Sequence, residues 1–403
     1  MCGAAGIAVF ASGPGQSHIF SVYITPISND LGISRTSISS AYAAATLLAA
    51  FGLPYVGRLI DRVGVRRVVL GVGIVFGFAN VAFGRVTGLL SLALAFGALR
   101  FLGQGSLMLS SNYLVSQWFS RRRGIALSLT ALGFSVSMAL HPPLAQWLIE
   151  QVGWRESWSW LGILTWVLLV PMAVVLLQNR PEAIGLTPDG EPVASPRSAC
   201  PRDAMDVGLT LRAAIRLPAF WIIALGLASL SMLVTGMFFH QVSVFSLQGL
   251  DAQTATRAFS ISAVVMVISM PVFGYLLDRL PTRPMFASAL LIMSAALVAL
   301  ALVRDLSSMV VFSAMFGLAN AALQSHYSFM WPRYFGRRHL GSIQGAAQTI
   351  GVVGAAIGPL PLGLAFDLFA SYTGVLYLLA ALPAVCAFML LFLKPPNLRI
   401  GPH

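Results

Sequence analysis

The residue with the clearest chemistry in this 403-residue chain is Arg100, an arginine in the middle of an apolar stretch. Residues 89–118 otherwise carry apolar or weakly polar side chains, with no Asp or Glu. A guanidinium stays charged at any accessible pH, and placing it mid-bilayer costs about 2.5–3.5 kcal/mol on insertion scales. Two explanations stay open. Arg100 binds an anionic substrate, or it donates to backbone carbonyls left free by the GPG sequence at 13–15.

Histidines are a second group with chemistry, because the apolar runs contain no Asp or Glu at mid-helix and histidine titrates near neutrality. His18 and His240 begin a repeated hexapeptide, HIFSVY and HQVSVF. We expect both to bind substrate and, together with His326, to carry the coupled proton. A lone buried histidine is more often a satisfied core residue, so that alternative also stays open. His141 precedes two prolines, and we expect it at a helix break.

Amide and aromatic side chains form a third group. Gln104 follows Arg100 by one helical turn, which puts both on one face. Asn320, Gln324 and Tyr327 are spaced by four and three residues and form a polar stripe on another segment. We expect these four side chains to bind substrate. The alternative is hydrogen bonding between helices, worth about 0.6 kcal/mol per bond in membrane bundles.

The composition indicates the elements that must position these groups. Hydrophobic residues make up 57% of the chain, charged residues 9%, and the mean hydropathy is +0.82. Apolar runs of about 20 residues match the thickness of a hydrocarbon core, and lipid requires each segment to satisfy its own backbone. We therefore predict an all-α integral membrane protein. Its twelve transmembrane helices lie near 3–26, 36–57, 68–86, 89–118, 124–149, 157–178, 219–247, 256–277, 285–303, 307–332, 340–367 and 372–393.

The formal net charge of +12 comes from basic residues whose distribution along the chain indicates the membrane topology. Most of the 25 Lys and Arg residues fall in one alternate set of connections between the predicted helices. By the positive-inside rule this set is cytoplasmic, so both termini are expected in the cytoplasm. The expected partners are the lipid bilayer and a small-molecule substrate. Nucleic acid is not expected, and we predict a monomer.

The chain also repeats. The pattern P-x-x-G-x-x-x-D-R at 54–62 returns at 271–279, an offset of 217 residues. We predict two pseudo-symmetric six-helix halves, 1–178 and 216–403. Residues 179–215, rich in Pro, Gly and charge, are predicted to form a cytoplasmic linker that ends in a short amphipathic helix.

The repeated loops also suggest a conformational latch. A carboxylate at Asp61 has the charge to dock against the positive N-terminal end of a helix near Gly341 and hold one state closed. In the alternative, these charges only fix topology. The residues assigned to the latch are Gly57, Asp61, Arg62, Arg66, Asp278 and Arg279.

Three segments carry a family resemblance. GRLIDRVGVRR at 57–67 is similar to the loop signature of the major facilitator superfamily, and GYLLDRLPTR at 274–283 resembles a degenerate second copy. RFLGQG at 100–105 resembles the helix-4 motif of that superfamily. The resemblance implies two halves that rock around a midplane site, often with proton coupling.

A narrower resemblance rests on three segments: RPEAIGLTPDG at 180–190, LRAAIRLPAFW at 211–221 and residues 118–135. These look like the bacterial branch related to monocarboxylate transporters and oxalate–formate antiporters. The chain departs from that pattern, because the eighth span has no buried charge and His18 stands where a lysine is common. The basic pair of the oxalate type in spans 8 and 11 is also absent.

Together these features predict a secondary transporter of a small organic anion, with a monocarboxylate as first choice, in a bacterial inner membrane. Proton coupling is left open. The alternatives are an exporter of neutral or amphiphilic molecules and a membrane sensor that has lost transport. An enzyme is not expected, because no nucleophile–base set, HExxH or phosphate loop is present. No cofactor or metal is expected either.

Overall fold

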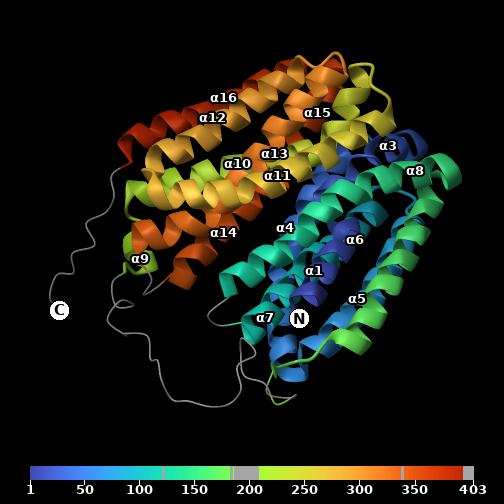
Figure 1. Ribbon diagram of the computed structural model, residues 1–403. Coiled ribbons are helices and arrows are strands. Elements are labelled where there is room, and N and C mark those ends of the chain that lie inside the picture. The colour runs from blue at the N-terminus through green and yellow to red at the C-terminus, as the bar shows by residue number, and fades with distance from the viewer. Residues whose placement is uncertain (120–122, 182–184, 186–207, 337–339, 394–403) are drawn as a thin grey trace. The chain divides into compact units, whose positions relative to one another are not determined.

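A computed structural model describes residues 1–119, 123–181, 185, 208–336 and 340–393 (Figure 1). Within these ranges the chain consists of helices and their connections. The one β-type interaction is an isolated bridge between Gly208 and Gly336. The predicted all-α class is confirmed.

The N-terminal helices begin with a broken span made of four short pieces. Longer helices follow, separated by short connections. The elements are α1 (Cys2–Ala11), η1 (Gly13–Gly15), α2 (Ser17–Phe20), α3 (Ile24–Leu31), α4 (Arg35–Val63), α5 (Val65–Phe83), α6 (Leu89–Leu99), the π-helix η2 (Arg100–Leu107), α7 (Met108–Trp118), α8 (Arg123–Pro171) and the π-helix η3 (Met172–Leu176).

The C-terminal helices begin with one short turn, which occupies the stretch predicted to be a short amphipathic helix. The elements are α9 (Leu211–Ala214), α10 (Pro218–Leu247), α11 (Ala252–Arg279), α12 (Thr282–Ala301), α13 (Leu306–Phe335), α14 (Leu340–Ile357), α15 (Pro359–Phe369), α16 (Thr373–Met389) and η7 (Leu390–Phe392). Most of the predicted linker, residues 182–184 and 186–207, lies outside the described residues.

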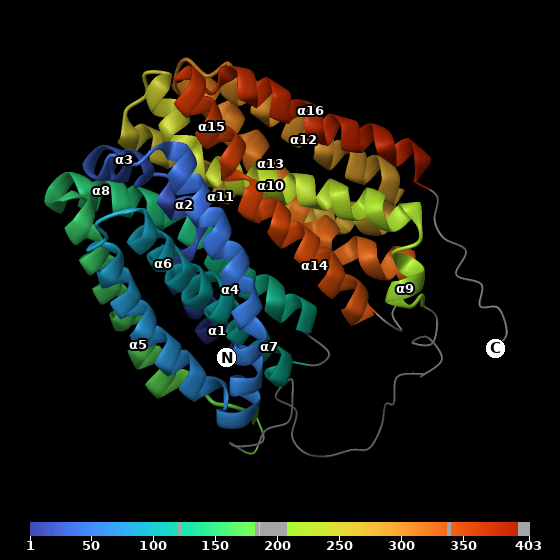
Figure 2. The ribbon, with the colours of Figure 1, turned by 180° about the vertical axis from the view of Figure 1, so that it is seen from behind.

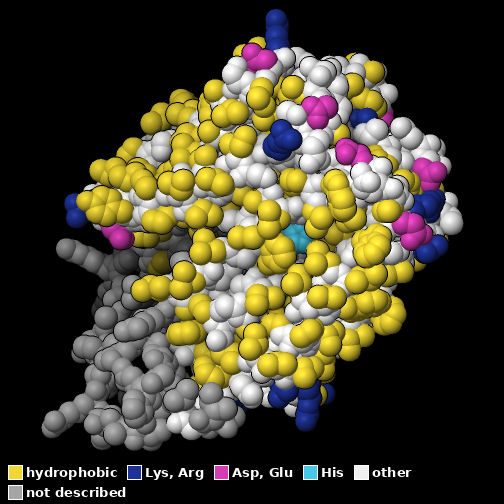
Figure 3. Space-filling model, turned by 45° about the vertical axis from the view of Figure 1, so that its right-hand side comes forward, with side chains coloured by type: hydrophobic (Ala, Val, Ile, Leu, Met, Phe, Trp, Pro, Cys, Tyr) yellow, Lys and Arg dark blue, Asp and Glu magenta, His cyan; other side chains and the backbone are white. Residues whose placement is uncertain are grey.

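The helices have the length and polarity of membrane spans. Ten helices among the described residues are long and apolar enough to cross a bilayer. The longest, α8, changes direction at Gly153, whose φ of 78° is non-helical. Two predicted spans therefore lie in α8, and the broken first span completes the predicted twelve. Large apolar side chains such as Phe51 (78% exposed) and Leu90 (75% exposed) face outward, and Figure 3 shows hydrophobic side chains over most of the described surface in that view. In a bilayer these side chains would contact lipid and not water, so exposing them carries no hydrophobic free-energy cost.

Residue contacts divide the chain into two compact units. Unit 1 contains residues 1–195 and 238–263, and unit 2 contains 196–237 and 264–403. Helices α10 and α11 therefore contribute residues to both units. The halves inferred from the repeat, 1–178 and 216–403, stay a prediction about sequence symmetry.

In unit 1, α8 packs along α1 and α5, while α4 packs along α6 (Figures 1 and 2). The contact between α1 and α8 requires a glycine. A Cβ at Gly133 would lie 2.3 Å from the carbonyl oxygen of Gly6. Small residues at such contacts let helix backbones approach closely, which is a main source of association energy in lipid. In unit 2, α12 packs against both α13 and α16.

Helix ends outside the bilayer are capped by side chains. The Ser34 hydroxyl accepts from the backbone N–H of Ser37 at the start of α4, at 3.1 Å. Asp305 forms a capping box with Ser308 at the start of α13. The hydrogen bonds from the Ser308 side chain and backbone lower the pKa of the Asp305 carboxyl. These caps satisfy donors that the first helical turn leaves unpaired.

The glycine contact predicts a stability difference. Gly133→Ala should lower the melting temperature of the purified protein, because overpacking a tight contact costs about 1–3 kcal/mol. Gly71→Ala in α5 is the matched control, since nothing lies within 4 Å of a Cβ there. The control should melt at or above the wild-type temperature, because alanine is the better helix former. Equal melting of the two variants in detergent would contradict the packing account.

Candidate functional site

Arg100 lies inside unit 1 with neutral partners. Its side chain is 4% exposed. Its Nε donates to Thr46 Oγ1 at 3.2 Å, and its Nη1 donates to the Gly15 carbonyl oxygen at 3.1 Å and to Ser17 Oγ at 3.3 Å. The guanidinium also lies over the Tyr42 ring, 5.0 Å from its centre. The Gly15 carbonyl is one of the acceptors that the GPG sequence was expected to leave free.

None of these partners carries a negative charge. Among the described residues the ion pairs are Arg85–Glu156 and Arg155–Asp30, both with exposed side chains. Within the same part of the chain, no carboxylate pairs with Arg100. The geometry therefore supplies hydrogen bonds for the guanidinium but no counter-ion. A buried, hydrogen-bonded cation still gains from an anion that approaches it.

The approach of the first span to Arg100 depends on small residues. A Cβ at Gly15 would lie 2.4 Å from the Leu99 carbonyl oxygen and 2.9 Å from Gly103 Cα. Glycine at this position lets η1 touch η2, so the Gly15 carbonyl reaches the guanidinium. The π-helical form of η2 starts at Arg100 itself. Such turns are frequent at functional sites.

Three partners of Arg100 were missed from the sequence. Ser17 and Tyr42 share a hydrogen bond of 2.6 Å between their side-chain oxygens. Tyr42 and Thr46 are four residues apart and share one face of α4. That spacing is a signal that could have placed them beside a buried polar group.

His18 belongs to a short hydrogen-bonded chain in unit 1. The ring is fully buried, and its Nε2 lies 3.3 Å from Ser137 Oγ. Ser137 Oγ in turn lies 3.1 Å from His141 Nδ1, which is also 3.2 Å from the Ser137 carbonyl oxygen. Two histidines are thus joined through one hydroxyl.

The chemistry of these atoms assigns the protons. A carbonyl oxygen can only accept, so His141 Nδ1 carries a hydrogen and donates. Ser137 Oγ then accepts from His141, and we assign its own hydrogen to the bond with His18 Nε2. In this assignment a neutral His18 carries its hydrogen on Nδ1. These positions follow from the hydrogen-bond network.

His18 Nδ1 is consequently a donor that lacks an acceptor. It is buried, and no partner for it exists among the described residues. The rings of Phe134 and Phe238 flank the His18 ring nearly at right angles to it, with centroids 5.6 and 5.8 Å away. A buried donor without an acceptor costs roughly 1–3 kcal/mol, so such a group calls for water or ligand.

The expectation of a helix break at His141 is wrong. Helix α8 runs through Pro142 and Pro143, and its non-helical residue is Gly153. Continuity of the helix puts His141 one turn after Ser137, where the two side chains can bond. Periodicity alone could not show that this face of α8 meets His18.

His240 has a similar but separate environment. It is fully buried, and its Nε2 lies 3.2 Å from Ser39 Oγ. The two repeated hexapeptides also touch within unit 1, because the backbone N–H of Val242 donates to Ser21 Oγ at 2.9 Å. Each histidine of the pair thus bonds to its own serine.

Two amide side chains have buried atoms without a partner among the described residues. Oε1 of Gln104 has no partner among the described residues, and neither amide atom of the fully buried Gln241 has one. Gln241 was missed from the sequence, although it is the second residue of the repeated hexapeptide. Unpaired buried amides are further candidates for water or ligand.

The expected residues of the tenth span lie in unit 2. Asn320 is buried and donates to the Phe316 carbonyl oxygen at 3.0 Å, while Gln324 is exposed. The Tyr327 hydroxyl is buried and has no partner among the described residues. His326 donates from Nδ1 to the Ala322 carbonyl oxygen at 2.7 Å and packs against Phe286. The stripe therefore contains a hydrogen-bonded amide, Asn320, and a hydroxyl without a partner among the described residues, that of Tyr327.

The predicted latch residues are mostly exposed. Asp61, Arg62 and Asp278 are exposed, Gly57 is half-buried, and the Arg279 guanidinium lies 4.2 Å from the centre of the Tyr275 ring. Arg66 differs, because its Nε donates to the Ala173 carbonyl oxygen at 3.2 Å. Within unit 1, Arg66 thus ties the loop to η3. Docking of Asp61 near Gly341 stays a prediction.

Comparison with known proteins identifies relatives of this chain. The family model described as the Major Facilitator Superfamily matches residues 5–359 and 246–402. Monocarboxylate transporter 11 of Mus musculus is 30% identical over 251 residues, 61% of this chain and 52% of that protein. The chain thus spans about half the length of this relative.

Two further matches cover nearly the whole chain. The probable nitrate/nitrite transporter NarK2 of Mycobacterium tuberculosis strain H37Rv is 25% identical over 398 residues, 92% of this chain and 91% of that protein. A crystal structure of the nucleoside transporter NupG aligns with a TM-score of 0.75 at 14% identity, covering 97% and 99% of the two chains. At that identity the likeness concerns the fold.

The tautomer assignment can be tested by NMR. With ¹⁵N-labelled histidine, His18 and His141 should both show the Nδ1–H form near neutral pH. Ser137→Ala should change the His18 signal, because it removes the donor to Nε2. Ser135→Ala is the matched control, since the Ser135 hydroxyl is buried without a partner among the described residues. An Nε2–H tautomer at His18 in the wild type would contradict the assignment.

Proposed function

The chain belongs to the Major Facilitator Superfamily, and from this premise we propose that it is a secondary transporter of a small organic anion, with a monocarboxylate as first choice. The proposed location is a bacterial inner membrane with both termini in the cytoplasm. Alternating access would expose the site to one side of the membrane at a time.

One observation carries this proposal: Arg100 is buried with hydrogen bonds but without a carboxylate among the described residues. Arg100 Nη1 bonds Ser17, and the next residue is His18, whose Nδ1 is an unpaired buried donor. A carboxylate has two oxygens. One carboxylate could accept a hydrogen bond from His18 and also supply the negative charge that Arg100 lacks among the described residues.

The names of the relatives agree with an anionic substrate. Monocarboxylates and nitrate are both small anions with planar oxygen acceptors, and these are the substrates named for the two relatives. Nitrate is therefore the second candidate, favoured by the alignment over 92% of this chain. An exporter of cationic amphiphiles is less favoured, because it would need a buried carboxylate.

The same geometry supports a proposal of proton coupling. A proton on His18 would stand near the permanent charge of Arg100, with the His141 ring joined through Ser137. Two cations in a buried site repel one another, and a substrate carboxylate would offset that repulsion. Anion and proton should therefore bind together, which is symport. His240 and His326 stay candidates for later steps of the proton path.

The substrate role of Arg100 can be tested in proteoliposomes. Arg100→Gln should reduce uptake of labelled lactate at least about 10-fold, since a charge-assisted bond is worth about 1.5–3 kcal/mol. Arg85→Gln is the control, because Arg85 is an exposed cation paired with Glu156. Normal uptake of lactate, pyruvate and nitrate by Arg100→Gln would remove the anion-binding role.

The proton role can be tested separately. His18→Gln should abolish the stimulation of uptake by an inward proton gradient while substrate exchange at equal pH continues. Ser135→Ala should keep the wild-type gradient response. If His18→Gln responds to the gradient as the wild type does, the coupled proton is carried elsewhere.

A further inference from the structure

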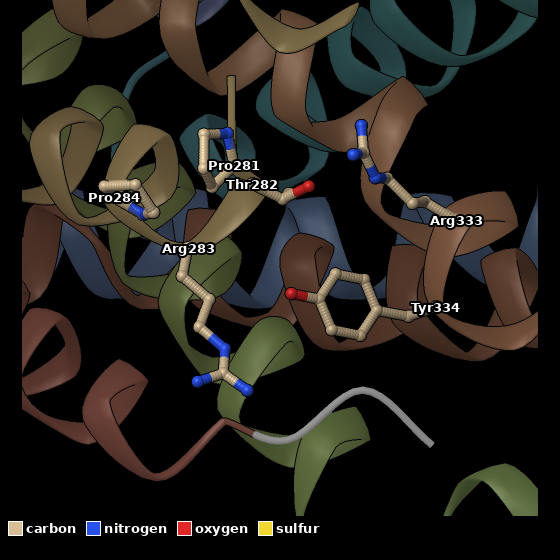
Figure 4. A pocket seen from close by; sticks show the side chains of 6 residues that line it. All are labelled: Pro281, Thr282, Arg283, Pro284, Arg333 and Tyr334. Carbon is tan, nitrogen blue, oxygen red and sulfur yellow. The ribbon is translucent and has the colours of Figure 1, made fainter. Parts of the chain in front are cut away.

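A second cationic site lies in unit 2, at the start of α12 (Figure 4). The structure contains a cavity of about 450 Å³ there. It lies where α11 passes into α12 and faces the end of α13. Its lining residues are Pro281, Thr282, Arg283, Pro284, Arg333 and Tyr334. None of them belongs to the proposed transport site.

The two arginines of this cavity come from different helices, and each is held by a neutral neighbour. Arg333 donates from Nη1 to the Leu277 carbonyl oxygen at 3.0 Å, and its guanidinium lies 5.2 Å from the centre of the Phe329 ring. Arg283 interacts with the Tyr334 hydroxyl. One nitrogen of Arg333 is thus used for anchoring, and its other donors are left for a ligand.

Among the described residues, no acidic side chain lines this cavity. Its lining contains no Asp or Glu, and both ion pairs found among the described residues lie in unit 1. Thr282 and Tyr334 line the same cavity, and Figure 4 shows their hydroxyls between the two guanidiniums, which lie on opposite sides of them. Thr282 is also the first residue of α12, whose first turn has no acidic residue, so its backbone N–H groups favour an anion too.

We propose that this cavity binds a phosphate group. A ligand held between the two hydroxyls would have one guanidinium on each side, and the several oxygens of a phosphate match such an arrangement better than the two of a carboxylate. The site is independent of the transported substrate. It would bind either the headgroup of an anionic phospholipid or a free phosphate compound.

The neighbouring surface favours the phospholipid. Ile268, Val272 and Tyr275 are exposed on α11, spaced by four and three residues, so they share one face that runs toward the cavity. This apolar face can hold an acyl chain while the headgroup occupies the arginine site. A basic cluster at the edge of a span is a known form of lipid recognition.

Native mass spectrometry of the purified full-length protein with dioleoyl phosphatidylglycerol tests the proposal. The wild type should retain the lipid through delipidation, and Arg283→Gln and Arg333→Gln should each reduce retention about 10-fold. Arg304→Gln is the matched control, because Arg304 is an exposed cation beyond the other end of α12 and does not line the cavity. It should retain lipid as the wild type does.

Two further measurements distinguish a phospholipid headgroup from a free phosphate compound and provide a variant that is expected to fold. If millimolar inorganic phosphate displaces the lipid, or binds to the wild type where the lipid does not, the site takes free phosphate. Tyr334→Phe keeps both charges and should still weaken retention about threefold, which covers a glutamine variant that fails to fold. Wild-type binding of both probes by Arg283→Gln and Arg333→Gln, or equal loss in Arg304→Gln, would overturn the proposal.

Discussion

The central constraint on unit 1 is the burial of one permanent charge. A guanidinium cannot shed its proton, so the fold must supply acceptors for Arg100 at the depth where lipid supplies none. The broken first span answers this need, because the turn at 13–15 frees the Gly15 carbonyl and small residues let it approach η2. Hydroxyls from Ser17 and Thr46 complete the shell.

These neutral acceptors satisfy hydrogen bonds but leave the charge uncompensated within the described chain. The residue after Ser17 is His18, whose buried Nδ1 has no partner among the described residues, so we propose that one anion meets both needs. Under the proposed function, neutral partners for Arg100 within the described residues suit a carrier. A permanent counter-ion would compete with an anionic substrate, whereas neutral acceptors hold the arginine ready and let the substrate leave.

Much of the fold could be predicted from the sequence, because lipid forces a simple relation between apolar length and helix. The repeat at 54–62 and 271–279 indicated the superfamily, and the GPG turn indicated an acceptor for Arg100. The partners of His18 could not be predicted. Ser137 and His141 share a face of α8, but helical spacing does not say which helix that face meets. The compact units also depend on tertiary contacts that no local pattern encodes.

Binding of a charged substrate and of its neutral analogue tests the central claim most directly. The melting temperature of the purified protein should rise with lactate and stay unchanged with lactamide, which has the same shape but no negative charge. Arg100→Gln should lose the response to lactate. Equal stabilisation by lactate and lactamide, or a full lactate response in Arg100→Gln, would contradict the account of a buried cation that is compensated by its substrate.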